Sequence, residues 1–257
     1  MLMIQFASDL HLEFPINREY LREYPLVPVA DTLILAGDLL VLNDDGSVDD
    51  VYEPFLDRLS QDFEQVYAIP GNHEYYNGFD LNNSIGEFQL KLRDNITLLN
   101  NSSVVIDNHK VIFSTLWSYV PSSFRKNEFA DFMRCKFKGE MLTTEGYNEL
   151  HKRAKAYISV EIEDNPRQHE VIVITHHLPS FSLIDKQYLG SDLNAGFASM
   201  SDGLIHESKA IAWVYGHSHS NSLPKQIGDT MLYSNPLGYV HVENPKGFDR
   251  SRLIWNY

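Results

Sequence analysis

Five short runs of apolar residues recur along the chain, separated by polar or irregular stretches. They occupy residues 2–7, 32–36, 65–69, 170–174 and 211–215. Short runs of this kind, bounded by Gly, Asp or Asn, are typical of buried strands. Between them, residues 51–64 and 144–164 carry apolar side chains three or four positions apart, which predicts amphipathic helices. No change of composition or Gly/Ser-rich linker divides the chain, so we predict one α/β domain over residues 1–257.

Weaker patterns predict the remaining elements. They are a hairpin at residues 104–113, a helix at residues 84–92, and strands at residues 230–233 and 253–255. In the helix of residues 51–64, the expected buried stripe consists of Val51, Phe55, Leu59 and Phe63. His151 and His169 are expected at the surface. The polar segment 118–143 fits either a lid above the sheet edge or an ordinary surface loop.

Polar clusters follow each of the five predicted strands. They are Asp9-Leu10-His11, Gly37-Asp38, Gly71-Asn72-His73-Glu74, Thr175-His176-His177 and Gly216-His217-Ser218-His219. In open α/β sheets, ligands gather at the carboxyl ends of the strands. Each cluster alone fits a hydrogen-bonded loop better than a metal site. Together they offer imidazole, carboxylate and amide ligands without a thiolate, a set that favours Mn, Fe or Zn over Cu(I) or an iron–sulfur cluster.

The five clusters, taken in this order, resemble the motifs of the calcineurin-like metallophosphoesterases. The similarity extends from Asp9 to His219, which is most of the chain. It implies a four-layer sandwich, in which two mixed β-sheets stack on each other and helices flank them. It also implies a metal-dependent phosphohydrolase that cleaves a phosphoester, and specifically a phosphodiester or nucleotide, by attack of a hydroxide held by two metal ions.

The resemblance assigns roles to single residues in these clusters. The ligands that it implies are Asp9, His11, Asp38 and His219 for the first metal ion, and Asp38, Asn72, His176 and His217 for the second. Asp38 would bridge the two ions, and Mn²⁺ is the expected metal, with Fe and Zn as alternatives. Two divalent ions about 3.5–4 Å apart can stabilise both the attacking and the leaving oxygen of an in-line displacement.

His73 occupies the position that the resemblance assigns to a catalytic histidine outside the ligand set. It can protonate the leaving oxygen or stabilise charge on the phosphate. The expected substrate-binding residues are Asn72, His73 and His177, and the alternative for His177 is a neighbour without a role. Glu74 is expected either to orient His73 or to serve only in the turn.

Several positions depart from the motifs of related branches. The Ser/Thr protein phosphatase branch is typified by the motifs Gly-Asp-x-Val-Asp-Arg-Gly and Arg-Gly-Asn-His-Glu. In this chain, Gly37-Asp38 is followed by Leu-Leu-Val-Leu at residues 39–42, and Pro70 stands before Gly71, where the second motif has an arginine. Both phosphate-binding arginines are therefore missing, which argues against a phosphoprotein substrate. Val41 stands where many relatives carry a second acid, and Leu237 replaces the arginine of an Asn-Pro-Arg-Gly-Tyr segment found in some bacterial relatives.

The charge balance narrows the substrate class. The chain has 35 acidic residues and 21 Lys or Arg residues, and its formal net charge of −14 repels polyanions and argues against a nucleic-acid partner. We therefore expect a small phosphoester substrate. The alternatives are a nuclease of the repair-exonuclease branch and a non-catalytic binding module on the same fold. Cys135 is the single cysteine and no apolar run reaches transmembrane length, so we expect a cytoplasmic protein without membrane contacts.

Overall fold

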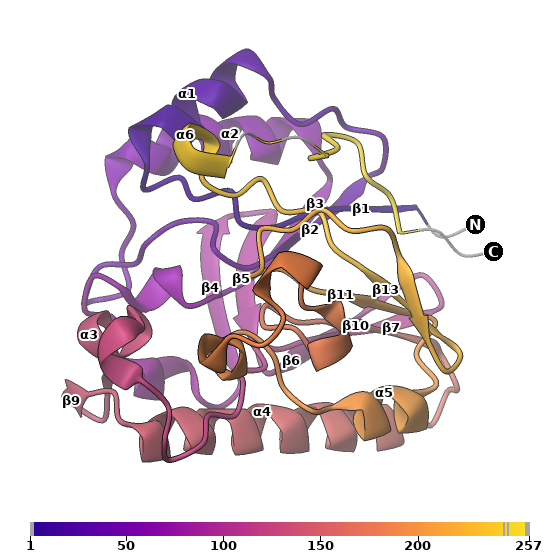
Figure 1. Ribbon diagram of the computed structural model, residues 1–257. Helices are drawn as coiled ribbons and strands as arrows, with labels where there is room; N and C mark the ends of the chain where they lie inside the picture. Colours follow the sequence, from indigo (N-terminus) through magenta and orange to yellow (C-terminus); the bar gives the residue numbers. More distant parts are fainter. Residues whose placement is uncertain (1–2, 244, 246, 255–257) are drawn as a thin grey trace.

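Two β-sheets lie face to face at the centre of the molecule (Figure 1). The computed structural model describes residues 3–243, 245 and 247–254. In the first sheet the strand order is β1 (Ile4–Ala7), β2 (Thr32–Ala36), β3 (Gln65–Ile69), β5 (Ile96–Asn100) and β4 (Phe88–Arg93). In the second sheet it is β12 (Lys225–Ile227), β13 (Thr230–Tyr233), β11 (Ala212–Val214), β10 (Glu170–Ile174), β7 (His109–Phe113) and β6 (Ser102–Ile106).

Both sheets combine a parallel centre with antiparallel edges, so both are mixed. Strands β1, β2, β3 and β5 run parallel, and β4 pairs with β5 in the antiparallel sense. Strands β7, β10, β11 and β13 run parallel, and β6 and β12 are their antiparallel edges. The pairing of β6 with β7 confirms the predicted hairpin. A separate ribbon pairs β8 (Lys136–Phe137) with β9 (Glu140–Met141).

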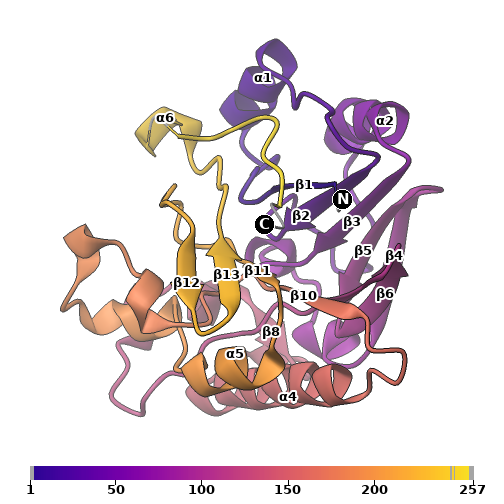
Figure 2. The same cartoon turned by 90° about the vertical axis from the view of Figure 1, so that its right-hand side faces the viewer.

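Helices cover the outer face of each sheet, which confirms the four-layer sandwich. Helices α1 (Pro15–Glu23) and α2 (Glu53–Asp62) lie on the first sheet, and α4 (Thr144–Glu163) and α5 (Asp202–Ser208) lie on the second (Figures 1 and 2). The short helices are α3 (Asp131–Arg134) and α6 (Val240–Glu243). None of the helices in the described residues combines the length and hydrophobicity needed to cross a membrane.

Side chains of the central strands alternate between two hydrophobic cores. In β2, Leu33 and Leu35 pack in the core beneath α1 and α2, whereas Ile34 and Ala36 pack in the core between the sheets. Successive strand residues point to opposite faces, and here both faces are covered. This double burial explains why the predicted strands are continuous apolar runs without alternating polar positions.

Residues 88–92 form a strand where a helix was predicted over residues 84–92. After a 3₁₀ turn at Leu81–Ser84, β4 begins at Phe88. Its apolar residues alternate with polar ones, which is the period of a strand, and its alternate polar side chains are exposed. In the described part of the strand predicted at residues 253–255, Leu253 forms one bridge to Gln5. Leu2 and Trp255, at the outer ends of two predicted strands, lie outside the described residues.

Both helices predicted from periodicity form, but two positions differ from expectation. Because α2 begins only at Glu53, Val51 precedes it and is 51% exposed, and Leu56 takes its place beside Leu59 in the buried stripe. His151 on α4 is buried, contrary to the expected surface position. Its Nδ1 lies 2.6 Å from the carbonyl oxygen of Trp117, a bond that satisfies the ring away from water.

Candidate metal centre

Strands from both sheets end at one place and deliver ligand-type side chains to it. Asp9 follows β1, Asp38 follows β2 and Asn72 follows β3, while His176 and His217 follow β10 and β11 of the other sheet. All five side chains are buried. Because the carboxyl ends of parallel strands share one edge of a sheet, a pattern repeated at separate strand ends becomes one cluster in space.

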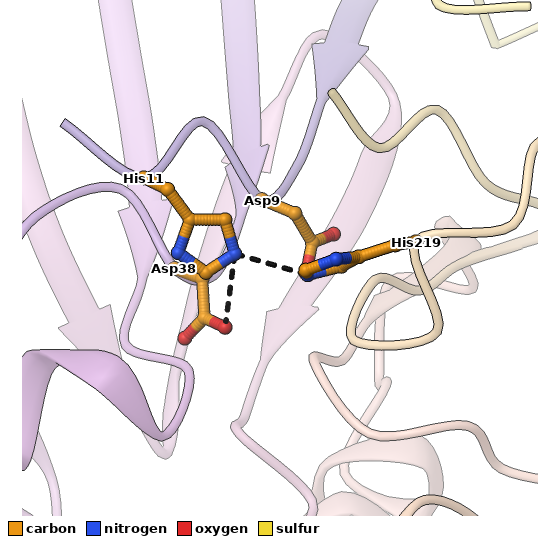
Figure 3. A group of neighbouring side chains, drawn as sticks. All are labelled: Asp9, His11, Asp38 and His219. Carbon is orange, nitrogen blue, oxygen red and sulfur yellow. Dashed lines mark hydrogen bonds and ion pairs between the residues drawn. The ribbon is translucent and has the colours of Figure 1, made fainter. Parts of the chain in front are cut away.

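A first group of side chains contains the four residues expected to bind the first ion. One ligand atom from each of Asp9, His11, Asp38 and His219 lies within 4.8 Å of the other three (Figure 3). The Nε2 atom of His11 is 3.0 Å from Nε2 of His219 and 3.8 Å from Oδ2 of Asp38. The Nε2 atom of His219 is 3.4 Å from Oδ1 of Asp9. The four ligand atoms therefore face one common point.

A second group shares Asp38 with the first. It consists of Asp38, His176 and His217, again with ligand atoms within 4.8 Å of one another. His176 Nε2 lies 3.3 Å from Oδ2 of Asp38 and 3.2 Å from Oδ1 of Asn72. His176 Nδ1 lies 2.9 Å from the carbonyl oxygen of Ala36, a bond that orients the ring with Nε2 toward the group. Asp38 thus stands between two sets of nitrogen and oxygen atoms.

The imidazole orientations fit bound cations. His11 Nδ1 is 2.9 Å from a Glu13 oxygen and His219 Nδ1 is 2.8 Å from a Glu243 oxygen. An ionised carboxylate only accepts hydrogen bonds, so both Nδ1 atoms carry a proton, and when both rings are neutral their two Nε2 lone pairs face each other. Such an arrangement is repulsive unless a positive charge lies near both atoms. In the second group, His217 Nε2 is buried and has no hydrogen-bond partner among the described residues. A nitrogen atom that binds a metal ion is expected to lack such a partner when the ion is absent.

The charges of the cluster favour the same conclusion. Burial alone would raise the pKa of Asp38, yet the neighbouring His176 and His73 hold that pKa well below its usual value. Burial and adjacent histidines keep the pKa of His217 well below its ordinary range, so that ring is neutral. Burial opposes a charge on His219, but Asp9 and Glu243 raise its pKa to about 10. A cation that binds here would displace such protons, because metal ligands must be deprotonated.

The backbone is strained at the ligand-type residues. Five of them have positive φ angles, namely Asp9 (55°), His11 (49°), Asp38 (54°), His217 (69°) and His219 (49°). Residues other than Gly rarely adopt this left-handed conformation, which costs on the order of 1–3 kcal/mol where surroundings enforce it. Strain that recurs at five positions of one site indicates that the loops are held to aim these side chains.

Two glycines of the motifs provide room for the cluster. A Cβ atom at Gly71 would lie 2.1 Å from Oδ1 of Asp38 and 2.6 Å from Nε2 of His176. A Cβ atom at Gly37, where φ is 92°, would lie 2.2 Å from Nδ1 of His176. No side chain larger than hydrogen fits at either position without moving a ligand-type residue. The Gly-Asp and Gly-Asn-His-Glu motifs therefore combine chemistry with the space that it needs.

Asn72 is oriented by a residue that has no sequence motif. Its Nδ2 donates to Asp131 Oδ1 at 2.8 Å and to the Tyr76 hydroxyl at 2.7 Å, so its amide oxygen faces His176. Asp131 is fully buried, and burial raises its pKa to about 6. It belongs to the segment of residues 118–143, which thus contributes to the site. Only the fold brings it to Asn72, since 59 positions separate the two residues.

The carboxylate beside His73 is Glu13 and not the neighbouring Glu74. Glu74 is fully buried and accepts backbone N–H groups of Asp38, Leu39 and Gly71 at 2.6–3.2 Å, so it ties the loops after β2 and β3 together. Burial and the charge of Asp38 raise its pKa to about 8. Glu13 Oε1 lies 2.7 Å from His73 Nδ1. A local signal for Glu13 exists, because it follows His11 by two positions just as His11 follows Asp9.

The three expected substrate-binding residues lie in different surroundings. Asn72 and His73 line a cavity of about 690 Å³ above the cluster, and His73 Nε2 there lies 3.2 Å from the Tyr239 hydroxyl. His177 is fully buried behind His217, with ring centroids 4.2 Å apart. Its Nε2 lies 3.2 Å from the hydroxyl of Tyr147. Because no surface of His177 reaches the cavity, a direct substrate contact does not fit its position.

The cavity wall is largely aromatic. It is lined by Phe14, Tyr76, Phe129, Tyr188, Phe197 and Tyr239 together with the cluster residues Asp38, Asn72, His217 and His219. His241 also lines it. Residues from the segments 128–134 and 184–197 form much of the wall, and Phe129 and Phe197 are in edge contact there. Convergent polar groups at the base of an aromatic pocket are the usual arrangement of a small-molecule site.

The fold and the two-group site define a metallophosphoesterase architecture. The chain belongs to the calcineurin-like phosphoesterase family, whose sequence profile matches residues 2–221. An uncharacterised mimivirus protein, L509 of Acanthamoeba polyphaga mimivirus, is 29% identical over 274 residues, which cover 95% of this chain and 94% of that protein. The phosphopantetheinyl hydrolase PptH of Mycobacterium tuberculosis has a similar fold, with a TM-score of 0.67 at 16% identity, over 98% of this chain and 95% of the other.

Proposed function

We propose that the protein hydrolyses a phosphodiester of a small molecule with two divalent cations at the Asp38 cluster. The observation that carries this proposal is the position of Asp38, shared by two groups of ligand atoms at the base of one cavity. Asp9, His11, Asp38 and His219 would hold one ion, and Asp38, Asn72, His176 and His217 the other. When bound, such ions lower the pKa of water and neutralise the negative charge that develops on phosphate oxygens.

The residues at the cavity wall have separate roles in this proposal. His73 stands outside the two groups, with Nε2 facing the cavity beside the Tyr239 hydroxyl. From there it can give a proton to the leaving oxygen. The aromatic rings of the wall would hold an apolar or planar substituent of the ester, such as a nucleobase, because ring faces bury well against one another.

The charges of the wall favour a diester over a monoester. Arg134 is the single Lys or Arg among the described residues that line the cavity, whereas Glu128, Asp131, Asp185 and Glu243 are acidic. A phosphomonoester dianion meets more repulsion from these acids than a diester, which carries one negative charge. The same balance disfavours a nucleic-acid strand, whose affinity depends on many basic contacts.

A substrate panel tests the proposal. Metal-loaded protein is incubated with phosphomonoesters, cyclic nucleotides, bis-aryl phosphates, a phosphopantetheinyl ester and single-stranded DNA. The phosphopantetheinyl ester is included because the structural neighbour is named as a hydrolase of that group. Asp38→Asn serves as the blank for contaminating phosphatases. Turnover confined to small diesters supports the proposal, and preferential cleavage of monoesters or DNA contradicts it.

Chelation is expected to abolish activity, and Mn²⁺ is expected to restore it more effectively than Mg²⁺. Four of the seven proposed ligands are imidazoles, namely His11, His176, His217 and His219. Mg²⁺ prefers oxygen ligands and retains its waters, whereas Mn²⁺ accepts nitrogen more readily. The measurement is kcat/KM of chelated protein during titration with each ion. Equal recovery with Mg²⁺ would argue against the proposed ligand set.

A further inference from the structure

Glu13 contacts two histidines of the site through one oxygen atom. Its Oε1 lies 2.9 Å from Nδ1 of His11 and 2.7 Å from Nδ1 of His73. The side chain is 15% exposed, and its second oxygen is buried without a hydrogen-bond partner among the described residues. The two imidazoles are themselves neighbours, with ring centroids 4.5 Å apart. One carboxylate thus joins a proposed metal ligand to the proposed proton donor.

We propose that Glu13 is a positioning residue that sets the orientation of His73 relative to the metal centre. This inference rests on the proposed function, because it concerns how His73 reaches the substrate. Glu13 accepts Nδ1–H from both rings, since a carboxylate has only acceptor atoms. The Nε2 atom of His11 is therefore directed to the first ligand group, and Nε2 of His73 is directed to the cavity and the Tyr239 hydroxyl.

The geometry distinguishes Glu13 from the other carboxylates around the centre. Both oxygens of Glu74 accept backbone N–H groups, and among the described residues the single imidazole that Glu243 contacts is that of His219. Loss of Glu243 should therefore weaken one ion site. Loss of Glu13 should also release His73, which lies outside the ligand groups. The chain has Val41 where many relatives carry a second acid, and Glu13 supplies a carboxylate to the site from the loop after β1 instead.

The experiment compares Glu13→Gln with Glu243→Gln at saturating Mn²⁺ on diesters of graded leaving-group pKa. For Glu13→Gln we expect two ions per chain, a kcat lower by about 10–100-fold on poor leaving groups, and a loss that shrinks as the leaving group improves. For Glu243→Gln we expect a loss that is uniform along the series and that becomes larger when Mn²⁺ is lowered below saturation. In a His73→Ala background, Glu13→Gln should add little on poor leaving groups, because His73 mediates its effect.

A spectroscopic measurement tests the contact without turnover. In Zn²⁺-loaded protein labelled with ¹⁵N-histidine, His73 should show an exchange-protected Nδ1–H proton signal, assigned by its absence in His73→Gln. Glu13→Gln should shift or remove this signal, and Glu243→Gln should leave it in place. If the wild type lacks the signal, or if the two Gln variants respond alike in kinetics and metal dependence, the positioning role is wrong. If the panel yields no substrate, the proposed function fails while the spectroscopic result still decides the contact.

Discussion

Asp38→Asn is expected to remove both metal ions. The loss of kcat/KM should exceed about 100-fold, the upper end of the range for removal of a residue that only supports a metal ligand. Asp38 belongs to both ligand groups, and its carboxylate is the negative charge between them. Asn keeps the size of the side chain and one carbonyl oxygen but loses that charge. Two cations brought close together without an anion between them repel each other strongly in a buried site. The protein should therefore lose both ions together.

Elemental analysis of purified protein measures this effect directly. His11→Ala is the control, because His11 belongs to the first ligand group and not to the second. It should lower the occupancy of one site and leave the other largely filled. The two variants differ in which ions they lose and not only in activity. An Asp38→Asn protein that still holds two ions per chain would rule out the bridging role of Asp38.

His73→Ala should keep its metal ions and its fold but lose activity on esters with poor leaving groups. His73 lies at the cavity wall outside both ligand groups, and its Nε2 faces the cavity. A proton donor contributes most where the departing oxygen is a strong base, and general acid catalysis typically contributes about 10²–10⁴-fold. With a good leaving group such as nitrophenolate, much of the loss should disappear.

The measurement is kcat/KM for the wild type and His73→Ala along a leaving-group series. If His73 only stabilises charge on the phosphoryl oxygens, the loss should be equal along the whole series. That outcome would replace the proton-donor role with an electrostatic one. Loss of bound metal in the variant would contradict the assignment of His73 as a residue outside the ligand set. Both outcomes are separate from a failure to fold, which circular dichroism detects.

The parts of the site that could be predicted from the sequence are those encoded by local pattern. A buried strand followed by a polar turn occupies a few consecutive residues, and the parallel order of the strands brings such turns together. Asp131 and Glu243 carry no such local pattern, because long stretches of chain separate them from Asn72 and His219. Tertiary structure alone places them. Glu13 was within reach of sequence reasoning, since the alternation of Asp9 and His11 continues to it.

The fold shows the same division between local and tertiary information. The central strands are apolar on both faces and are easily recognised. Strand β4 is a sheet edge with exposed polar side chains, and its flanking residues resemble a helix as much as a strand when considered alone. Phe88, Leu90 and Leu92 recur at every second position, which is the period of a strand. The pairing with β5 that stabilises the strand over a helix, however, depends on the whole sheet.

The ligand-type residues come from both sheets, and this division links metal binding to the stability of the whole sandwich. Asp9 and Asp38 follow strands of one sheet, while His176 and His217 follow strands of the other. Ions held by all of them would fasten the two layers together at one edge. A ligand that binds only the folded state adds about 4.1 kcal/mol to the free energy of unfolding at a free concentration of 1,000 times Kd. The melting temperature should therefore rise with added Mn²⁺ and fall on chelation, which provides a binding assay that needs no knowledge of the substrate.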